Sequence, residues 1–245
     1  MEELYERGQR AVLLLHSYTN GPQVFKPLLQ ALLRHNYTVM TPTYRGHNTH
    51  DVRDVLAFNM DDFVADSYQA LDRLRTLGYQ VVSVGGLSIG SAITSYLLLN
   101  DPTIPSGALF SPPILGDATQ SQIPTGFLKT FLLQQRLQGI SEQDSVDMFN
   151  ERVEPLLSQF LRDYNQWLEP LRPRLEEIKQ PVFISVGGAD EVIDGPLALS
   201  LPTYLPQAEY IESHYFAQGT HYLVLGQIGR LLAQKYITFL DNIQI

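Results

Sequence analysis

Short apolar runs alternate with segments of helical periodicity along most of this chain. Residues 11–15 (AVLLL) form a continuous apolar run that ends in a polar loop, which is typical of a strand buried on both faces of a parallel sheet. Similar runs follow at residues 38–41, 80–85, 107–110, 182–186 and 209–212. The intervening segments carry apolar residues at helical spacing, as in residues 24–33 and 63–77. This alternation predicts an α/β fold, a doubly wound and mostly parallel sheet with helices on both faces.

The alternation stops between residues 112 and 180. Helical patterns around residues 127–137 and 141–167 fill this stretch, and no strand-like run interrupts them. Their apolar positions exceed what a single stripe packed on a sheet needs. We therefore predict one domain over residues 1–245 with a small helical cap inserted at about 112–180, over the carboxyl ends of the strands, where open α/β sheets place their sites. Two ordinary surface helices are the alternative.

Composition narrows the function classes. The 245 residues suffice for one sizeable core. A net charge of -9, from 17 basic and 26 acidic residues, leaves no basic surface for nucleic acid or anionic membranes. The chain has no cysteine, which excludes disulfides, thiolate metal sites and cysteine nucleophiles.

The amino terminus is acidic and the chain has no long apolar run, so we expect a cytoplasmic protein without stable membrane insertion. A homodimer is left open.

Residues 85–90 (GGLSIG) stand between an apolar run and a segment with the spacing of a buried helix. A strand, sharp turn and helix around G-x-S-x-G form the turn on which α/β-hydrolases expose a nucleophilic serine. Glycines two residues before and after Ser88 allow the strand and helix to approach closely. The alternative is a phosphate-cradling turn, but the segment has neither G-x-G-x-x-G nor the lysine of a P-loop. We predict that Ser88 is the nucleophile.

A serine hydroxyl needs an imidazole to take its proton. The chain has six histidines. In folds with this serine turn the catalytic residues occur in the order serine, acid, histidine, so the base must follow Ser88, and only His214 and His221 do. His221 lies in a loop between the last apolar run and the final helical segment, whereas His214 adjoins a strand. We predict His221 as the base, with His214 as the alternative.

Three carboxylates compete to orient that imidazole. Asp190, Glu191 and Asp194 all follow the apolar run at residues 182–186. Asp190 comes soonest after two glycines, a spacing that turns a short carboxylate toward the imidazole. Asp194 lies further along, and Glu191 is expected to face away. Asp190 is the predicted acid.

Two backbone N–H groups are needed to hold the oxyanion that develops during acyl transfer. One comes from Ile89, the residue after the nucleophile. The polar loop of residues 16–21 follows the first apolar run, and Tyr18 is expected to supply the other. His16 precedes the elbow, so we interpret it as a hydrogen-bonded scaffold for this loop.

Together these segments resemble the α/β-hydrolase-fold serine carboxylesterases, relatives of bacterial carboxylesterases and monoacylglycerol lipases. Matching motifs occur in the family's order at residues 13–16, 44–47, 86–90, 189–193 and 219–221. The resemblance implies Ser88 as nucleophile, Asp190 as acid and His221 as base, with Tyr18 and Ile89 as oxyanion donors.

The chain departs from that family at two positions. Ser17 stands where these esterases usually have glycine, and Ser91 replaces a second glycine after the elbow. Ser17 is expected either to shift the oxyanion loop or to add a hydroxyl to it. Arg45 and His47 belong to a turn that is expected to brace the site without a catalytic role.

The predicted function is hydrolysis of uncharged esters with short to medium acyl chains through an acyl-enzyme, without a metal or organic cofactor. Monoacylglycerol lipase and thioesterase activities remain alternatives. A serine at the elbow argues against epoxide hydrolases and haloalkane dehalogenases, which use aspartate there. A non-catalytic ligand-binding protein is the competitor from another class, because fold does not determine function.

Overall fold

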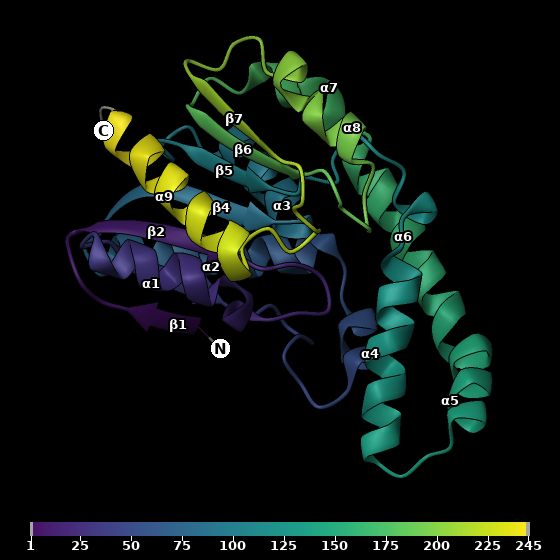
Figure 1. The fold of residues 1–245 in the computed structure, drawn as a ribbon. Helices are drawn as coiled ribbons and strands as arrows, with labels where there is room; N and C mark the ends of the chain where they lie inside the picture. Colours follow the sequence, from purple (N-terminus) through teal and green to yellow (C-terminus); the bar gives the residue numbers. More distant parts are fainter. Residues whose placement is uncertain (1, 244–245) are drawn as a thin grey trace.

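A computed structural model describes residues 2–243, and a seven-stranded sheet forms its centre (Figure 1). Neighbouring strands are parallel except for the antiparallel pair of β1 and β3. The predicted α/β-hydrolase fold with a mostly parallel sheet is confirmed. In spatial order the strands are β1 (Glu2–Tyr5), β3 (Thr38–Pro42), β2 (Arg10–Leu15), β4 (Gln80–Leu87), β5 (Gly107–Phe110), β6 (Val182–Gly187) and β7 (Ile211–Phe216).

Alternate residues of the central strands face two separate apolar layers. In β2, Leu13 and Leu15 pack in one buried cluster, whereas Val12 and Leu14 pack in the other. A pair of helices on each face of the sheet contributes to each layer, and the first layer continues into the residues between β5 and β6. The first layer contains α2 (Met60–Thr76) and α3 (Ile89–Asn100), and the second contains α1 (Lys26–Arg34) and α9 (Gly226–Asn242). Burial on both faces explains why these strands are continuously apolar in sequence.

Two strands at the edges of the sheet differ from the sequence-based expectation. β1 has the polar sequence EELY and pairs with β3 alone, so no apolar run marks it. β7 begins at Ile211 and continues to Phe216, beyond the run expected at residues 209–212. An edge strand is partly exposed to solvent and tolerates polar residues, which weakens its sequence signal. His214 therefore lies within β7 and not beside it.

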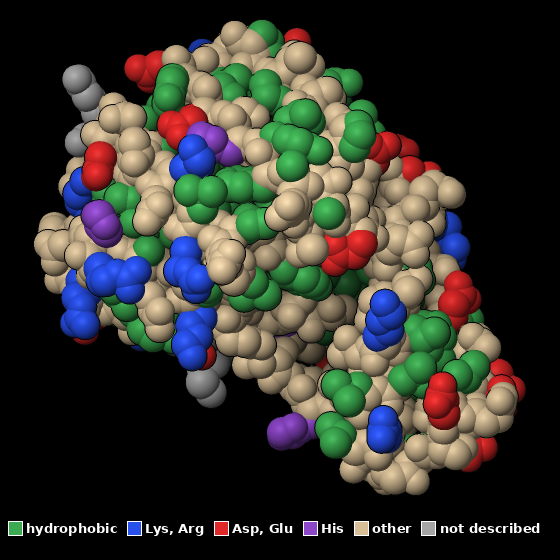
Figure 2. All heavy atoms as spheres, in the orientation of Figure 1, with side chains coloured by type: hydrophobic (Ala, Val, Ile, Leu, Met, Phe, Trp, Pro, Cys, Tyr) green, Lys and Arg blue, Asp and Glu red, His purple; other side chains and the backbone are tan. Residues whose placement is uncertain are grey.

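Residues 111–181, here called the helical insertion, connect β5 to β6. The hairpin of α4 and α5 projects from the body, and α6 returns to it (Figure 1). Figure 2 shows hydrophobic and charged side chains interspersed on this projecting lobe. The helices are α4 (Ile123–Leu137), α5 (Glu142–Met148), a π-helical turn (Phe149–Val153), α6 (Glu154–Leu168) and α7 (Leu171–Arg174).

Short helical segments complete the connections near the strand ends. None of the helices within residues 2–243 is long and apolar enough to cross a membrane. The short segments are α8 (Gly195–Leu199) and the 3₁₀ turns Pro22–Phe25, Val52–Ala57, Ala118–Gln120, Leu175–Glu177 and Leu201–Tyr204.

Candidate active site

Ser88 stands at the sharp turn between β4 and α3. Its backbone has φ 56° and ψ −121°, a strained combination for a residue other than glycine. A Cβ atom at position 86 would lie 2.0 Å from the carbonyl oxygen of Gly90. A Cβ at position 90 would lie 2.1 Å from the carbonyl oxygen of Leu15. Backbone segments thus pass so close to positions 86 and 90 that only glycine fits there. This close packing holds Ser88 in its strained conformation.

The imidazole of His221 contacts the carboxylate of Asp190. Nδ1 lies 3.1 Å from Oδ1 and 3.0 Å from Oδ2, and the Asp190 side chain is fully buried. Oδ1 also accepts hydrogen bonds from the backbone N–H groups of Val192 (2.9 Å) and Ile193 (3.1 Å). Burial raises the pKa of Asp190, but these hydrogen bonds and the attraction of His221 outweigh it, so the pKa lies below its ordinary value. An ionised Asp190 keeps the proton on Nδ1 and leaves Nε2 as the basic nitrogen.

Ser88 and His221 line one cavity of about 310 Å³. Within residues 2–243 the side-chain hydrogen-bond partner of the His221 ring is Asp190, and the Ser88 hydroxyl forms no hydrogen bond to it. None of the residues that line the cavity is Asp, Glu, Lys or Arg. They are Ser17, Tyr18, Thr19, Asn20, Val24, Ser88, Gln122, Ile123, Gly126, Phe127, Thr130, Val192, His221, Tyr222 and Leu225.

The backbone N–H groups of Tyr18 and Ile89 have no hydrogen-bond partner within residues 2–243. Ile89 is the first residue of α3, where N–H groups have no partner within the helix. Neither N–H forms a hydrogen bond with the described part of the chain. Tyr18 lines the cavity that contains Ser88. Both N–H groups therefore lie next to residues of this cavity, Tyr18 itself and Ser88, which precedes Ile89.

His16 holds the loop that carries Tyr18. Its Nδ1 donates to the carbonyl oxygen of Ser17 (2.9 Å), and its Nε2 accepts from the N–H of Tyr44 (3.2 Å). Burial, together with repulsion from His47, lowers the pKa of His16 to about 3. The ring is therefore neutral, as its accepting Nε2 requires, and it ties the loop to the end of β3.

Comparison with known proteins shows which family this chain belongs to. Residues 6–225 match the serine aminopeptidase S33 family. The chain belongs to this family. It is 29% identical over 189 residues to a thermostable monoacylglycerol lipase from Bacillus sp. (strain H-257), covering 77% of this chain and 73% of that protein. It is also 20% identical over 240 residues to a carboxylesterase from Bacillus subtilis (strain 168), covering 98% and 95%.

The fold of this S33 hydrolase also occurs among solved structures. A metagenome-derived lipolytic enzyme matches it with a TM-score of 0.74 at 19% identity, covering 99% of this chain and 97% of that one. At this level of identity the similarity supports the shared fold alone.

The alternative site residues have other partners in this S33 hydrolase. The carboxylate of Asp194 accepts from the N–H of Leu197 (2.9 Å) and caps α8. His214 contacts Glu212 within β7, with Nε2 2.6 Å from Oε1. Neither Asp194 nor His214 lines the cavity that contains Ser88.

Glu191 was expected to face away, but its carboxylate contacts the backbone of the loop after β7 that carries His221, here called the histidine loop. Its Oε2 accepts from the N–H of His221 at 3.1 Å. The loops after β6 and β7 meet so closely that a Cβ at position 187 would lie 2.4 Å from the carbonyl oxygen of Gly219. This approach places the carboxylate of Glu191 beside the backbone of His221. Glu191 therefore fixes the loop, while Asp190 contacts the ring.

Sequence reasoning missed two further contacts around the site. The Ser111 hydroxyl donates to the carbonyl oxygen of His221 at 2.8 Å, and Ser111 has a φ of 47°. The side-chain amide of Asn20 donates to the hydroxyl of Tyr222 at 3.1 Å and joins the oxyanion loop to the histidine loop. The position of Ser111 directly after β5 is the only signal in the sequence that could have suggested its role.

The remaining residues singled out from the sequence support neighbouring structure. Arg45 forms ion pairs with Asp66 (2.6 Å) and Asp62 (3.1 Å). The ring of His47 packs against Tyr18 with centroids 5.7 Å apart. Burial lowers the pKa of His47 to about 4.

The two serines that replace family glycines differ in their hydrogen bonding. The Ser91 hydroxyl donates to the carbonyl oxygen of Ser88 at 2.5 Å. The Ser17 hydroxyl is buried without a partner among the described residues.

No group of three or more His, Asp or Glu side chains within residues 2–243 is placed to hold a metal ion.

Proposed function

We propose that this chain hydrolyses uncharged carboxylic esters with Ser88 as nucleophile, His221 as base and Asp190 as the acid that orients it. The observation that carries the proposal is that His221, which lines the same cavity as Ser88, is paired behind the cavity with the buried carboxylate of Asp190. Ester hydrolysis agrees with the monoacylglycerol lipase and carboxylesterase to which the chain is similar.

In the proposed reaction the Ser88 oxygen attacks the ester carbonyl while Nε2 of His221 takes the hydroxyl proton. The oxyanion of the tetrahedral intermediate accepts hydrogen bonds from the N–H groups of Tyr18 and Ile89. The C–O bond to the alcohol then breaks, and the alcohol leaves with the proton held by His221. Water, deprotonated by the same imidazole, attacks the acyl-enzyme and releases the carboxylic acid and free Ser88.

The lining of the cavity favours esters over aminopeptidase substrates. An aminopeptidase must bind the ammonium group at the substrate's amino terminus, and a carboxylate is the usual partner for a buried ammonium. No Asp or Glu lines this cavity within the described chain. Its volume of about 310 Å³ and its apolar side chains suit an uncharged substrate with a short to medium acyl chain.

The helical insertion is proposed to act as a cap over the site. It supplies Gln122, Ile123 and Phe127 to the cavity that Ser88 lines. The N–H of Gln122 donates to the carbonyl oxygen of Val192 at 3.2 Å, which ties the start of α4 to the loop that carries Asp190. Substrate selection would then reside largely in α4.

Replacement of Ser88 tests the proposal. Ser88→Ala should lower kcat on p-nitrophenyl esters by about a millionfold and abolish labelling by a fluorophosphonate probe. Ser95→Ala is the matched control, because Ser95 is also buried in α3 and its hydroxyl donates to the carbonyl oxygen of Ser91, away from His221 and Asp190. Its activity should stay close to that of the wild type.

The substrate class is tested with aminoacyl p-nitroanilides in parallel with the esters. Faster turnover of the anilides would overturn the ester proposal in favour of a peptidase. If the wild-type protein neither turned over esters nor reacted with the probe, the non-catalytic alternative would hold. Retention of turnover in Ser88→Ala would remove Ser88 from its assigned role.

A further inference from the structure

The side chain of Tyr18 stacks on a ring from the helical insertion. Tyr18 and Phe160 of α6 have ring centroids 4.4 Å apart and planes inclined by 10°. Only 5% of Tyr18 and 7% of Phe160 is exposed. Tyr18 is also the residue whose backbone N–H we assign to the oxyanion. The insertion therefore contacts the oxyanion loop directly through this ring pair.

Within residues 2–243 no hydrogen bond holds the Tyr18 side chain in place. Its hydroxyl is buried without a hydrogen-bond partner in the described part of the chain, and burial raises its pKa. The other ring contacts are an edge contact with His47 at 5.7 Å and a tilted contact with Phe127 at 6.3 Å. The stack on Phe160 has the shortest centroid distance of the three. Packing therefore determines where the ring lies, with Phe160 as its nearest support.

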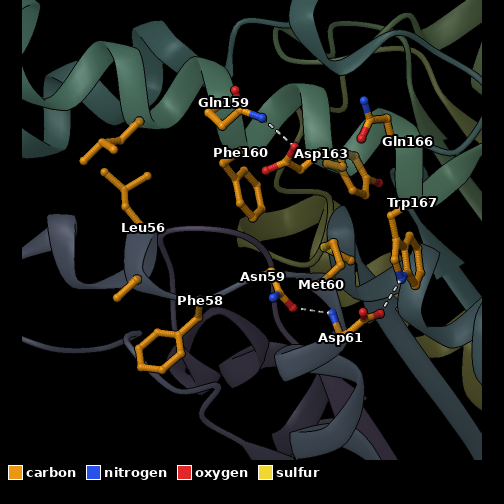
Figure 3. Close-up of a pocket in the computed structure, with 13 residues that line it drawn as sticks. Leu56, Phe58, Asn59, Met60, Asp61, Gln159, Phe160, Asp163, Gln166 and Trp167 are labelled. Atoms are coloured by element: carbon orange, nitrogen blue, oxygen red, sulfur yellow. Dashed lines mark hydrogen bonds between the residues drawn. The ribbon is translucent and has the colours of Figure 1, made fainter.

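Phe160 does not line the cavity that contains Ser88. It lines a separate groove of about 550 Å³ between the start of α2 and α6, with Met60, Asp163 and Trp167 among its neighbours. Figure 3 shows the Phe160 ring projecting from α6 into this groove on the side where Asn59 and Met60 lie. The cavity that contains Ser88 is therefore lined by Tyr18 and not by Phe160. Of the rings that Phe160 contacts, which are those of Tyr18, Phe63 and Tyr164, Tyr18 is the one that lines this cavity.

We infer that Phe160 is a positioning residue for the oxyanion hole, because its ring fixes Tyr18 and thereby the direction of the Tyr18 N–H. The inference rests on the proposed function. Loss of one oxyanion donor typically costs about 100- to 1000-fold in kcat. A donor that is displaced but still present should cost less, about 10- to 100-fold. The effect belongs to the transition state, since the oxyanion forms only there.

The test combines kinetics with a trifluoromethyl ketone, which adds to Ser88 and places an oxyanion in the hole. Phe160→Ala should lower kcat on a p-nitrophenyl ester about 10- to 100-fold, with KM changed by less than about threefold. Affinity for the ketone should fall in parallel with kcat/KM. Phe160→Tyr retains a stacking ring and should restore most of the activity.

A matched control separates this role from general packing of the insertion. Phe149 is also buried in the helical insertion. Its ring contacts those of Phe127 and Phe131, with centroid distances of 6.3 Å and 5.8 Å, and not that of Tyr18. Phe149→Ala should leave kcat and affinity for the ketone within about threefold of wild type. If Phe160→Ala does not fold, as judged by circular dichroism and Tm, Phe160→Leu retains most of the volume without the stacked ring.

Three outcomes would overturn the inference. They are an unchanged kcat in Phe160→Ala or Phe160→Leu, an increase in KM alone in these variants, and a loss of kcat that leaves their affinity for the ketone intact. These outcomes bear on Phe160 only if the wild-type protein is active and Ser88→Ala is inactive. If the wild type is inactive or Ser88→Ala is active, the proposed function itself fails.

Discussion

The cavity that contains Ser88 has two walls of different construction. The sheet wall consists of the loops at the carboxyl ends of the strands, with Tyr18, Ser88 and His221 facing the cavity. Close backbone approaches fix it, as where Gly86 meets Gly90. The insertion wall consists of side chains on and around α4, including Phe127.

This difference separates chemistry from selectivity. Substituting a residue of the sheet wall displaces backbone or removes a reacting group, whereas substituting the insertion wall changes mainly the shape of the space. Loops held by a packed sheet can maintain reacting atoms in place, and an inserted helix can vary without disturbing them. We therefore expect large effects on kcat from the sheet wall and smaller effects on substrate preference from the insertion wall.

The largest effect should distinguish the two histidine–carboxylate pairs of the molecule. His221→Ala removes the proposed base on the sheet wall and should lower kcat by about 100,000- to 1,000,000-fold. His214→Ala removes the ring paired with Glu212 in β7, outside the cavity, and should change kcat by less than about threefold. Steady-state kinetics on one ester decide between them. Equal losses would show that the base has been misassigned.

A smaller effect concerns the buried rings behind the sheet wall. The pKa values of His16 and His47, about 3 and about 4, lie below the value near 6.5 of an unfolded histidine. Between pH 6.5 and 4 the unfolded chain therefore binds more protons than the folded one. The free energy of unfolding should fall as the pH falls through this range, by up to about 1.4 kcal/mol per pH unit for each histidine.

Urea denaturation at pH 7, 6 and 5 measures this dependence. His47→Gln should reduce the slope with pH, while His50→Gln, which changes an exposed histidine in the same segment, should leave it unchanged. An identical slope in both variants would mean that His47 does not contribute.

The smallest effect belongs to the insertion wall. Phe127→Ala enlarges the cavity and should shift the preference in kcat/KM toward longer p-nitrophenyl esters by about tenfold. Phe131→Ala is the control, because Phe131 is buried on the same helix but does not line the cavity. If both variants keep the wild-type chain-length preference, the insertion wall does not select the acyl group.

Local sequence patterns carried most of the information about the sheet wall. Continuous apolar runs predicted the buried strands, and the glycines around Ser88 predicted its turn, because each feature depends on residues close together in the chain. Chain order and loop position pointed to His221 and Asp190. Edge strands were harder, since β1 and β7 are only partly buried and lack a continuous apolar run.

Contacts between distant segments had no such local signal. Ser111 meets His221 across 110 positions of sequence, and Tyr18 stacks on Phe160 of the insertion. Glu191 contacts the backbone of His221 only because the loops after β6 and β7 approach at a glycine.

By itself, the sequence determined the α/β alternation, the turn at Ser88 and the candidates for base and acid, because periodicity and turn chemistry are local. Tertiary structure alone decided that Asp190 and not Asp194 contacts His221 and that Glu191 faces the histidine loop. It also placed Phe160 behind the oxyanion loop. The physical reason is that side-chain partners are chosen by the packing of elements far apart in the chain, which no short stretch of sequence encodes.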